Sequence, residues 1–250
     1  MKTAIYVEIK KLRTKKVWLT VAALIVIQFL WVLWSLGRMD AQDMAQGWML
    51  CLYQFPLLNT IMMPVVAAVI ASQLCDIEHK GNTLKLLETV MPSGRLFDAK
   101  FLVSALYILA AVLLQAGSIA ALGSIKGFTY SVPLTKLFQY GVFTLVVGLT
   151  LLLFQVILSL LFTHQVVPFI VGLVGGLAGL YSLFFPAAIN RLLLWGYYGV
   201  LMQVGMDWEP ATRVVDYYYL PIDWPGVITI IAVFSALYFI GRILYQKKEV

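Results

Sequence analysis

The sequence predicts an all-α membrane protein with six transmembrane helices. The chain has 250 residues, of which 62% are hydrophobic and only 12% are charged, and its mean hydropathy is +0.90. Soluble domains carry about 25% charged residues, so this chain has too little charge to cover a soluble surface. The apolar residues form continuous runs and do not alternate, which favours helical spans over strands. These observations exclude a soluble enzyme, a secreted disulfide scaffold and a disordered chain.

Six apolar stretches are long enough to cross a bilayer, which takes about 20 residues for ~30 Å of hydrocarbon. They are residues 17–36, 49–74, 101–123, 137–162, 166–185 and 226–243. No soluble domain and no internal repeat interrupts this order. Residues 1–250 are therefore predicted to form a single transmembrane domain.

Residues 1–16 are predicted to form an amphipathic helix before the first span. Ile5, Ile9 and Leu12 share a face at helical spacing, and six Lys and Arg residues surround them. Basic amphipathic helices lie on anionic membrane surfaces. The other interpretation is a charged tail that holds the orientation of the first span, and the two are compatible.

The basic residues predict the orientation of the chain. With both termini inside, 13 of the 18 Lys and Arg residues fall on the inner side. This distribution satisfies the positive-inside rule, whereas the inverted topology violates it. We expect a multi-pass protein of the cell membrane with cytoplasmic N- and C-termini. The net charge of +6 has the same origin, and no nucleic-acid partner is expected.

The inner segment after the second span is predicted to form a short amphipathic helix over residues 76–91. Its apolar residues share a face: Ile77, Leu84, Leu87 and Met91. Pro92, Ser93 and Gly94 favour a turn that ends this helix. The helix either lies on lipid headgroups or forms a docking surface for a soluble partner.

The outer segment 186–225 is too long for a simple connection. Its first part predicts a re-entrant or surface-lying helix over residues 188–204, and an aromatic cap follows. The segment contains eight Trp and Tyr residues, which favour the level of the lipid headgroups.

The chain has no motif for catalysis or for nucleotide binding. It has two histidines, no H-E-x-x-H, C-x-x-C or G-x-S-x-G sequence, and no acidic residue well inside a predicted span. Ion-coupled pumps and intramembrane proteases need buried ionisable residues, so both are disfavoured. Because no Gly-Lys dipeptide exists, there is no Walker A loop. We therefore expect no enzyme activity and no bound cofactor, and any ATP and Mg²⁺ must belong to a partner.

Two groups of residues within the spans are candidates for a pathway or a protomer interface. Asn59 and Thr60 lie between two prolines of the second span, where a kink is possible. Helix packing is the other interpretation of these polar residues, and we prefer it. The fifth span carries overlapping G-x-x-x-G patterns at Gly172, Gly175, Gly176 and Gly179. Such patterns allow close helix packing, either within the chain, between protomers, or at a sliding contact.

The inner segment carries the sequence Glu78-x-x-Gly81-x-Thr83-x-x-Leu86-Leu87, followed by Pro92-x-x-Arg95 and by Lys100. This arrangement resembles the ABC-2 type permeases, the six-span membrane subunits of bacterial ABC exporters with the type V exporter fold. The spacing departs from the family pattern because Asn82 stands between the glycine and the threonine. The resemblance implies that residues 76–91 are a coupling helix that contacts a separate ATPase subunit. The implied coupling residues are Asp76, Glu78, Gly81, Thr83, Leu84, Leu86 and Leu87.

The resemblance covers the whole layout, including the basic N-terminal helix and outer re-entrant helices before the last span. It implies a second permease protomer, either identical or homologous. The small size and the residues around 76–102 are most similar to lantibiotic-immunity permeases, which implies export of an amphipathic antimicrobial peptide. Permeases for a lipid, a drug, an ion or a maturation factor are alternatives within the family. A non-transporting scaffold that recruits a soluble protein is the alternative from another class.

Overall fold

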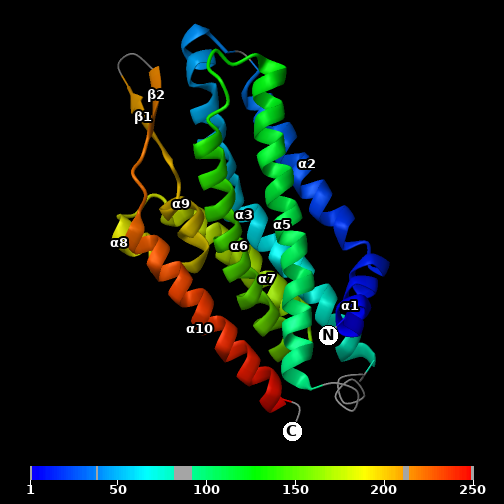
Figure 1. The fold of residues 1–250 in the computed structure, drawn as a ribbon. Coiled ribbons are helices and arrows are strands. Elements are labelled where there is room, and N and C mark those ends of the chain that lie inside the picture. The colour runs from blue at the N-terminus through cyan, green and yellow to red at the C-terminus, as the bar shows by residue number, and fades with distance from the viewer. Residues whose placement is uncertain (1, 38, 82–91, 211–213, 249–250) are drawn as a thin grey trace.

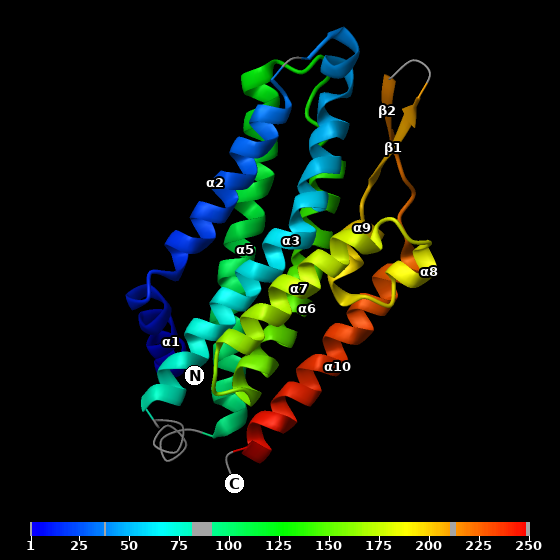
Figure 2. The same cartoon turned by 180° about the vertical axis from the view of Figure 1, so that it is seen from behind.

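The computed structural model describes residues 2–37, 39–81, 92–210 and 214–248, and it shows an elongated helical bundle (Figure 1). In chain order the elements are α1 (Lys2–Thr14), α2 (Val17–Ser35), α3 (Ala41–Gly81), α5 (Ser93–Lys126), α6 (Leu134–Leu161), α7 (Val166–Ser182), α8 (Ala187–Asn190), η1 (Leu194–Gly196), α9 (Tyr197–Val200), β1 (Val204–Glu209), β2 (Val214–Tyr219) and α10 (Trp224–Lys248). The helix α1 and the end of α10 lie at one end of the bundle, and the β-hairpin lies toward the other (Figures 1 and 2).

Five helices of the described chain are long and apolar enough to cross a membrane: α2, α3, α5, α6 and α10. The helix α7 has 17 residues. At 1.5 Å per residue it is about 26 Å long, which is shorter than the ~30 Å of hydrocarbon. The structure thus confirms a multi-pass helical membrane protein, whereas six full spans are not confirmed.

The helix α3 is much longer than the span predicted at 49–74. It begins after Asp40, whose carboxylate accepts a hydrogen bond from the Asp43 N–H (2.8 Å), while Asp43 accepts one from the Asp40 N–H (3.3 Å). This reciprocal pair caps the free N–H groups of the first turn. The helix continues through Pro56 and Pro64 to Gly81. It therefore extends beyond the predicted apolar span at both ends.

The helix α5 also begins earlier than the span predicted at 101–123. Pro92 precedes its first turn, and the Leu96 N–H donates to the Pro92 carbonyl at 3.3 Å. The predicted turn at Pro92–Gly94 is therefore wrong, because proline suits the start of a helix, where no hydrogen-bond donor is needed. The helix ends at Gly127, whose φ of +70° is left-handed and favours glycine.

The helix α1 forms within the predicted range 1–16, but its three apolar residues do not share one environment. Leu12 is buried and Ile5 is partly buried against the bundle, whereas Ile9 is 41% exposed. Glu8 takes the inner position in place of Ile9 and is fully buried. The helix therefore packs on the bundle through Ile5, Glu8 and Leu12. The helical spacing of the apolar residues did not reveal the burial of Glu8, because acidic residues are rarely buried.

The outer segment does not form the predicted helix 188–204, and it adds one small β-hairpin to an otherwise helical fold. Three short helical elements, α8, η1 and α9, occupy 187–200, and an antiparallel hairpin of β1 and β2 follows. The register pairs Val204 with Tyr219 and Glu209 with Val214. Valine, tyrosine and tryptophan fit strands, so the cap residues form a hairpin.

The hairpin is fastened to the first turns of α3. Asp216 accepts hydrogen bonds from the side-chain amides of Gln42 (2.8 Å) and Gln46 (3.1 Å), and Gln46 also accepts one from the Tyr217 N–H (3.0 Å). Burial raises the pKa of the Tyr217 phenol, and the charge of Asp43 adds to this effect, so the ring stays neutral. The hairpin is thus a fixed part of the bundle.

Candidate functional site

Four buried polar side chains meet in the interior of the bundle, one from each of four helices. Gln28 comes from α2, Asn59 from α3, Gln115 from α5 and Tyr140 from α6. Each is at most 2% exposed. We call these four residues the polar cluster.

The members of the polar cluster bond directly to one another. Gln115 Nε2 donates to Gln28 Oε1 and to Asn59 Oδ1, both at 2.8 Å, and Gln28 Nε2 donates to Asn59 Oδ1 at 3.1 Å. Asn59 Nδ2 donates to Gln115 Oε1 at 3.2 Å and to the Tyr140 hydroxyl at 3.1 Å. The Tyr140 hydroxyl donates to Gln115 Oε1 at 2.9 Å. Each amide oxygen in the cluster therefore has a donor.

The polar cluster is uncharged, so it suits a structural connection better than the transfer of protons or ions. Single hydrogen bonds between membrane helices average about 0.6 kcal/mol. A set shared by four helices fixes their relative rotation, because moving one helix breaks bonds to the other three. The cluster is therefore a place where α2, α3, α5 and α6 are held in one arrangement.

Asn59 and Thr60, the candidate pathway residues, are both fully buried inside the chain. Asn59 is a member of the polar cluster. The Thr60 hydroxyl donates to the Leu57 carbonyl of its own helix at 2.7 Å. In this arrangement both side chains serve helix packing, which is the interpretation that we preferred from the sequence.

The four glycines of α7 form a stripe that packs against the rest of the chain. A Cβ on Gly172 would lie 2.9 Å from the Ala68 side chain, and one on Gly176 would lie 3.0 Å from the Thr60 carbonyl. The backbones of α7 and α3 thus approach too closely for larger side chains. Of the alternatives left open by the G-x-x-x-G pattern, the structure shows packing within the chain at these two positions.

The other two glycines of the stripe receive Trp195. A Cβ on Gly175 would overlap the Trp195 ring, and one on Gly179 would lie 2.7 Å from the Trp195 carbonyl carbon. Trp195 also stacks edge-on against Phe154 of α6, with ring centroids 5.3 Å apart. Trp195 therefore packs the outer segment against both α7 and α6.

A third contact lies between α6 and the start of α7. Gln155 is fully buried beside Pro168 and Gly172. In the orientation that satisfies both neighbours, its amide donates to the Pro168 carbonyl at 3.0 Å and accepts from the Gly172 N–H at 3.2 Å. The Gln155 side chain thus forms hydrogen bonds with two backbone groups of α7, and these bonds hold α7 against α6.

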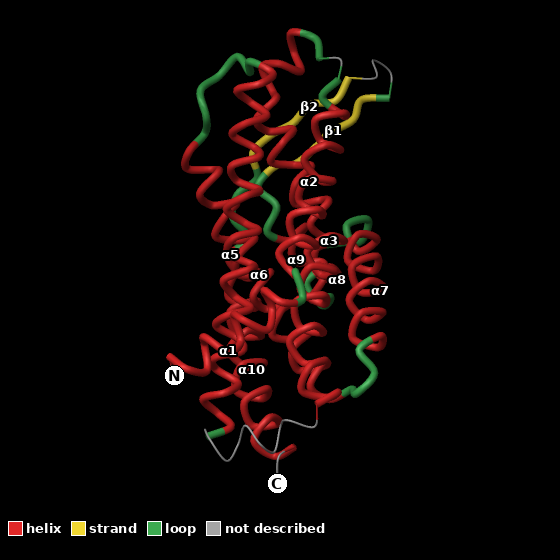
Figure 3. The backbone as a smooth tube through the Cα atoms, turned by 90° about the vertical axis from the view of Figure 1, so that its right-hand side faces the viewer, coloured by secondary structure: helices red, strands yellow, loops and turns green. Residues whose placement is uncertain are grey.

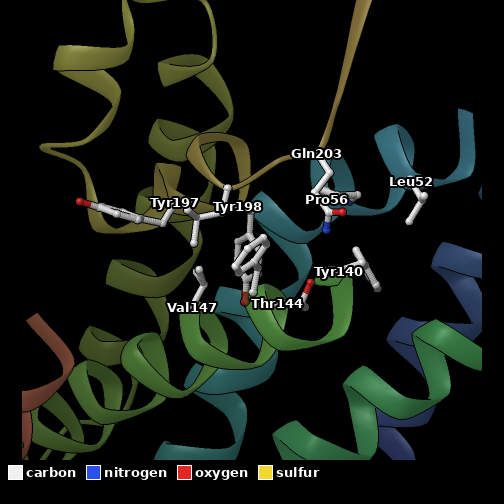
Figure 4. Close-up of a pocket in the computed structure, with 10 residues that line it drawn as sticks. Leu52, Pro56, Tyr140, Thr144, Val147, Tyr197, Tyr198 and Gln203 are labelled. Carbon is white, nitrogen blue, oxygen red and sulfur yellow. The ribbon is translucent and has the colours of Figure 1, made fainter. Parts of the chain in front are cut away.

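Where α9 meets α6, a small cavity is lined mainly by apolar side chains and by a few polar groups (Figure 4). Its volume of about 10 Å³ is roughly the space that one water molecule requires. Tyr198 lies beside Thr144 and Val147, whereas the ring of Tyr197 points in the opposite direction (Figure 4), and both residues are buried. The Tyr198 hydroxyl and Gln203 Oε1 are buried, and neither has a hydrogen-bond partner within the described chain. Tyr140 also lines this cavity, so the cavity adjoins the polar cluster.

At the end of the bundle away from the hairpin, ion pairs join α1 to α5 and α3. Glu8 Oε1 lies 3.2 Å from Lys100 Nζ and 2.9 Å from Lys11 Nζ, and both Glu8 and Lys100 are fully buried. Lys15 lies 3.7 Å from Asp76, near the end of α3. Burying charge is costly unless it is paired, so these contacts hold α1 in one position. Lys100, a residue of the motif that suggested a family, thus faces α1.

The same end of α5 is joined to α10. Asp98 accepts a hydrogen bond from the Tyr238 hydroxyl at 2.8 Å and lies 3.5 Å from the Arg242 guanidinium. At the other end of α10, Arg191 forms a bidentate pair with Asp223 at 2.8 and 2.9 Å. Asp223 also accepts a hydrogen bond from the Gly226 N–H (3.3 Å), which caps α10.

The predicted coupling helix 76–91 lies only partly within the described residues. Residues 76–81 continue α3 without a break, so Asp76, Glu78 and Gly81 belong to the end of that helix. Thr83, Leu84, Leu86 and Leu87 lie outside the described residues. The prediction of a separate helix is therefore wrong for residues 76–81, which extend α3. The coupling role of the segment remains a prediction.

Sequence reasoning missed three of the residues that join the elements, namely Glu8, Gln28 and Tyr140. Gln28 is the single amide in the span predicted at 17–36, and Glu8 is the single acid among the first 16 residues. A lone polar residue in an apolar or basic context was the available signal. The partners of these residues on other helices could not be found, because they lie 25 to 92 positions away along the chain.

Comparison with protein families shows that residues 4–179 match the family described as "ABC-2 family transporter protein". Comparison with curated proteins and with solved structures gives no match. The matched region runs from α1 to α7 and includes all members of the polar cluster. Proteins of this family are membrane components of transporters and are not themselves catalytic. The match spans well over half of the 250 residues, and the chain therefore belongs to the ABC-2 family of transporter proteins.

Proposed function

We propose that this chain is the permease subunit of a bacterial ABC exporter and that a separate subunit binds and hydrolyses ATP with Mg²⁺. One observation carries the proposal beyond family membership. The segment proposed to receive the ATPase connects α3 to α5, and these two helices carry Asn59 and Gln115 of the polar cluster. A displacement of the connecting segment therefore acts on two of the four helices that the cluster holds together.

The ion pairs around α1 support this proposal. Asp76, at the start of the proposed coupling segment, pairs with Lys15, and Lys100, which follows the segment, pairs with Glu8. Both contacts lead to α1. The ends of α3 and α5 are thus joined to a third element, and a movement imposed by the ATPase is shared among all three helices.

In the proposed cycle, ATP binding brings two ATPase subunits together beneath two permease protomers. The free energy of ATP binding must differ between two arrangements of the bundle for this to drive transport. We place the change at the polar cluster, where neutral side chains can exchange hydrogen-bond partners with one another without exposing a buried charge. Two protomers, identical or homologous, then release cargo at the hairpin end.

The proposed cargo is an amphipathic antimicrobial peptide, as in lantibiotic immunity. This assignment rests on the likeness of residues 76–102 to lantibiotic-immunity permeases. Export of a lipid, a drug, an ion or a maturation factor is the alternative within the family. Cytoplasmic termini in the bacterial cell membrane complete the proposal, because they place the coupling segment on the side where ATP is found.

Substitution in the coupling segment tests the transport function. Glu78→Arg and Leu87→Asp should each abolish cargo-stimulated ATPase activity in the purified complex, because a reversed charge and a buried charge both weaken docking. Lys247→Gln, an exposed position near the end of α10, is the control and should retain the activity. Full stimulation in both coupling variants would contradict the docking assignment.

Purification with bound partners separates an exporter from a scaffold. An exporter should retain a protein that carries a Walker A sequence, and its ATPase activity should respond to candidate peptides in proteoliposomes. A partner without that sequence would instead support a scaffold. If a lipid or a drug stimulates the ATPase activity and peptides do not, the cargo is one of the alternatives within the family.

A further inference from the structure

Five basic residues of α1 and of the turn that follows it fall into two sets. Lys11 and Lys15 face the bundle, where they pair with Glu8 and Asp76. The other set, Lys10, Arg13 and Lys16, is exposed and forms no ion pair with the described residues. The inward pairs explain how α1 is held on the bundle. They leave the outward set without a structural role inside the chain.

The outward cations line an open groove of about 490 Å³. Its other lining residues are Tyr6, Ile9 and Thr14. Tyr6 is 67% exposed, and Ile9 is exposed here too. The groove thus combines three positive charges with an aromatic ring and an aliphatic side chain.

The position of the groove places it beside the membrane. Lys16 has a left-handed backbone (φ 53°) at the bend between α1 and α2. The spanning helix α2 begins at the next residue, and its first turn exposes Trp18 and Leu19. Tryptophan is typical of the interface between headgroups and hydrocarbon. The cations therefore lie at headgroup level, directly above an apolar, lipid-facing surface.

We propose that this groove binds the headgroup of an anionic phospholipid. The phosphate lies among Lys10, Arg13 and Lys16, and guanidinium groups bind phosphate oxygens in a two-pronged geometry. The acyl chains descend along Trp18 and Leu19. A membrane lipid fits better than free phosphate, because only a lipid uses the apolar side chains that adjoin the charges.

The bound lipid would contact the same helix that buries Glu8 against Lys100. Its headgroup stabilises the outer face of α1, and the ion pair stabilises the inner face. The composition of the membrane thereby influences how firmly α1 holds the ends of α3 and α5. The proposal requires only that the protein lies in a membrane, so it stands or falls separately from the transport function.

Native mass spectrometry of the full-length protein tests the site. The protein in detergent is titrated with phosphatidylglycerol and, separately, with phosphatidylcholine. Each cation near an anionic surface contributes a factor of about five to binding. Lys10→Gln/Arg13→Gln should therefore weaken phosphatidylglycerol binding at least about tenfold and leave phosphatidylcholine binding unchanged. Arg13→Gln alone should weaken it about fivefold.

The matched control is Arg95→Gln/Lys247→Gln, which removes two exposed cations elsewhere in the chain. It should bind phosphatidylglycerol like the wild type. An equal loss in both double variants would overturn the site, because only net charge would then matter. Wild-type binding in the Lys10→Gln/Arg13→Gln variant would overturn it as well. Displacement of the lipid by millimolar inorganic phosphate would show that free phosphate is the occupant.

Discussion

Asn59 shows how one uncharged side chain can position three others. It contacts Gln28, Gln115 and Tyr140, which come from three other helices. In an interior without water, a polar group that loses its partner keeps the full cost of its desolvation. The stability of this region therefore depends on the set of bonds as a whole.

Asn59→Leu should lower the free energy of unfolding by about 1–3 kcal/mol, because amide and hydroxyl groups of the three remaining residues lose partners. Thermal unfolding in detergent measures the effect. Ser118→Ala on α5 is the control, since that exposed hydroxyl donates to the Leu114 carbonyl of its own helix. Its stability should change by less than about 0.5 kcal/mol. An Asn59→Leu protein as stable as the control would show that the polar cluster contributes nothing.

The elements differ in how far the sequence predicts them. The bounds of α2 and α6 lie within a few residues of the predicted spans, because each is a continuous apolar run with polar flanks. The hairpin was missed, since its tyrosines and tryptophans are as typical of a membrane interface as of a strand. The helix α3 was predicted too short, because hydropathy marks the apolar part of a helix and not its polar ends.

The polar cluster was beyond sequence reasoning for a different reason. Asn59 was recognised as a polar residue within a span, but each of the spans that supply the cluster carries several polar side chains. Which of them meet depends on the rotation of every helix, and this rotation is set by packing across the whole bundle. The glycines of α7 were easier, because their spacing itself defines a face.

Gly176→Leu should separate α7 from α3 and destabilise the protein by about 1–3 kcal/mol or more, because the new side chain meets the α3 backbone at Thr60 and Ile61. Thermal unfolding measures this as well. Gly117→Leu on α5 is the matched control: a Cβ there meets nothing within 4 Å. It should be neutral or slightly stabilising, since leucine favours helices over glycine. Equal stability of the two variants would mean that the close approach of α7 and α3 is not required.

At the scale of the whole molecule, contacts gather at the two ends and in the middle. One end has the ion pairs of α1 and the contact of Asp98 with α10, and the other has the hairpin on α3. The polar cluster lies between them (Figure 3 shows the course of the helices). This arrangement assigns the charged contacts to the ends of the helices and the neutral ones to the interior, as a low-dielectric surrounding requires.

Labelling of single cysteines should reveal the orientation of the molecule. Cys51 and Cys75, which are both buried, are first replaced by alanine. Intact cells are then treated with a membrane-impermeant maleimide. Trp208→Cys in the hairpin should be labelled, whereas His164→Cys between α6 and α7 should be labelled only after the cells are opened, because both positions are exposed on opposite sides of the bundle. The reverse pattern would invert the proposed topology.

The attachment of the hairpin to α3 matters for any molecule that approaches that end of the protein. Gln42 and Gln46 hold Asp216 and Tyr217 in place, and the rings of Tyr53 and Tyr217 lie 5.6 Å apart. A ligand at this end therefore meets a preformed aromatic surface, made by the rings of Tyr53 and Tyr217. These side chains lose little conformational freedom when the ligand binds. This aromatic surface should favour rigid ligands whose shape already matches it.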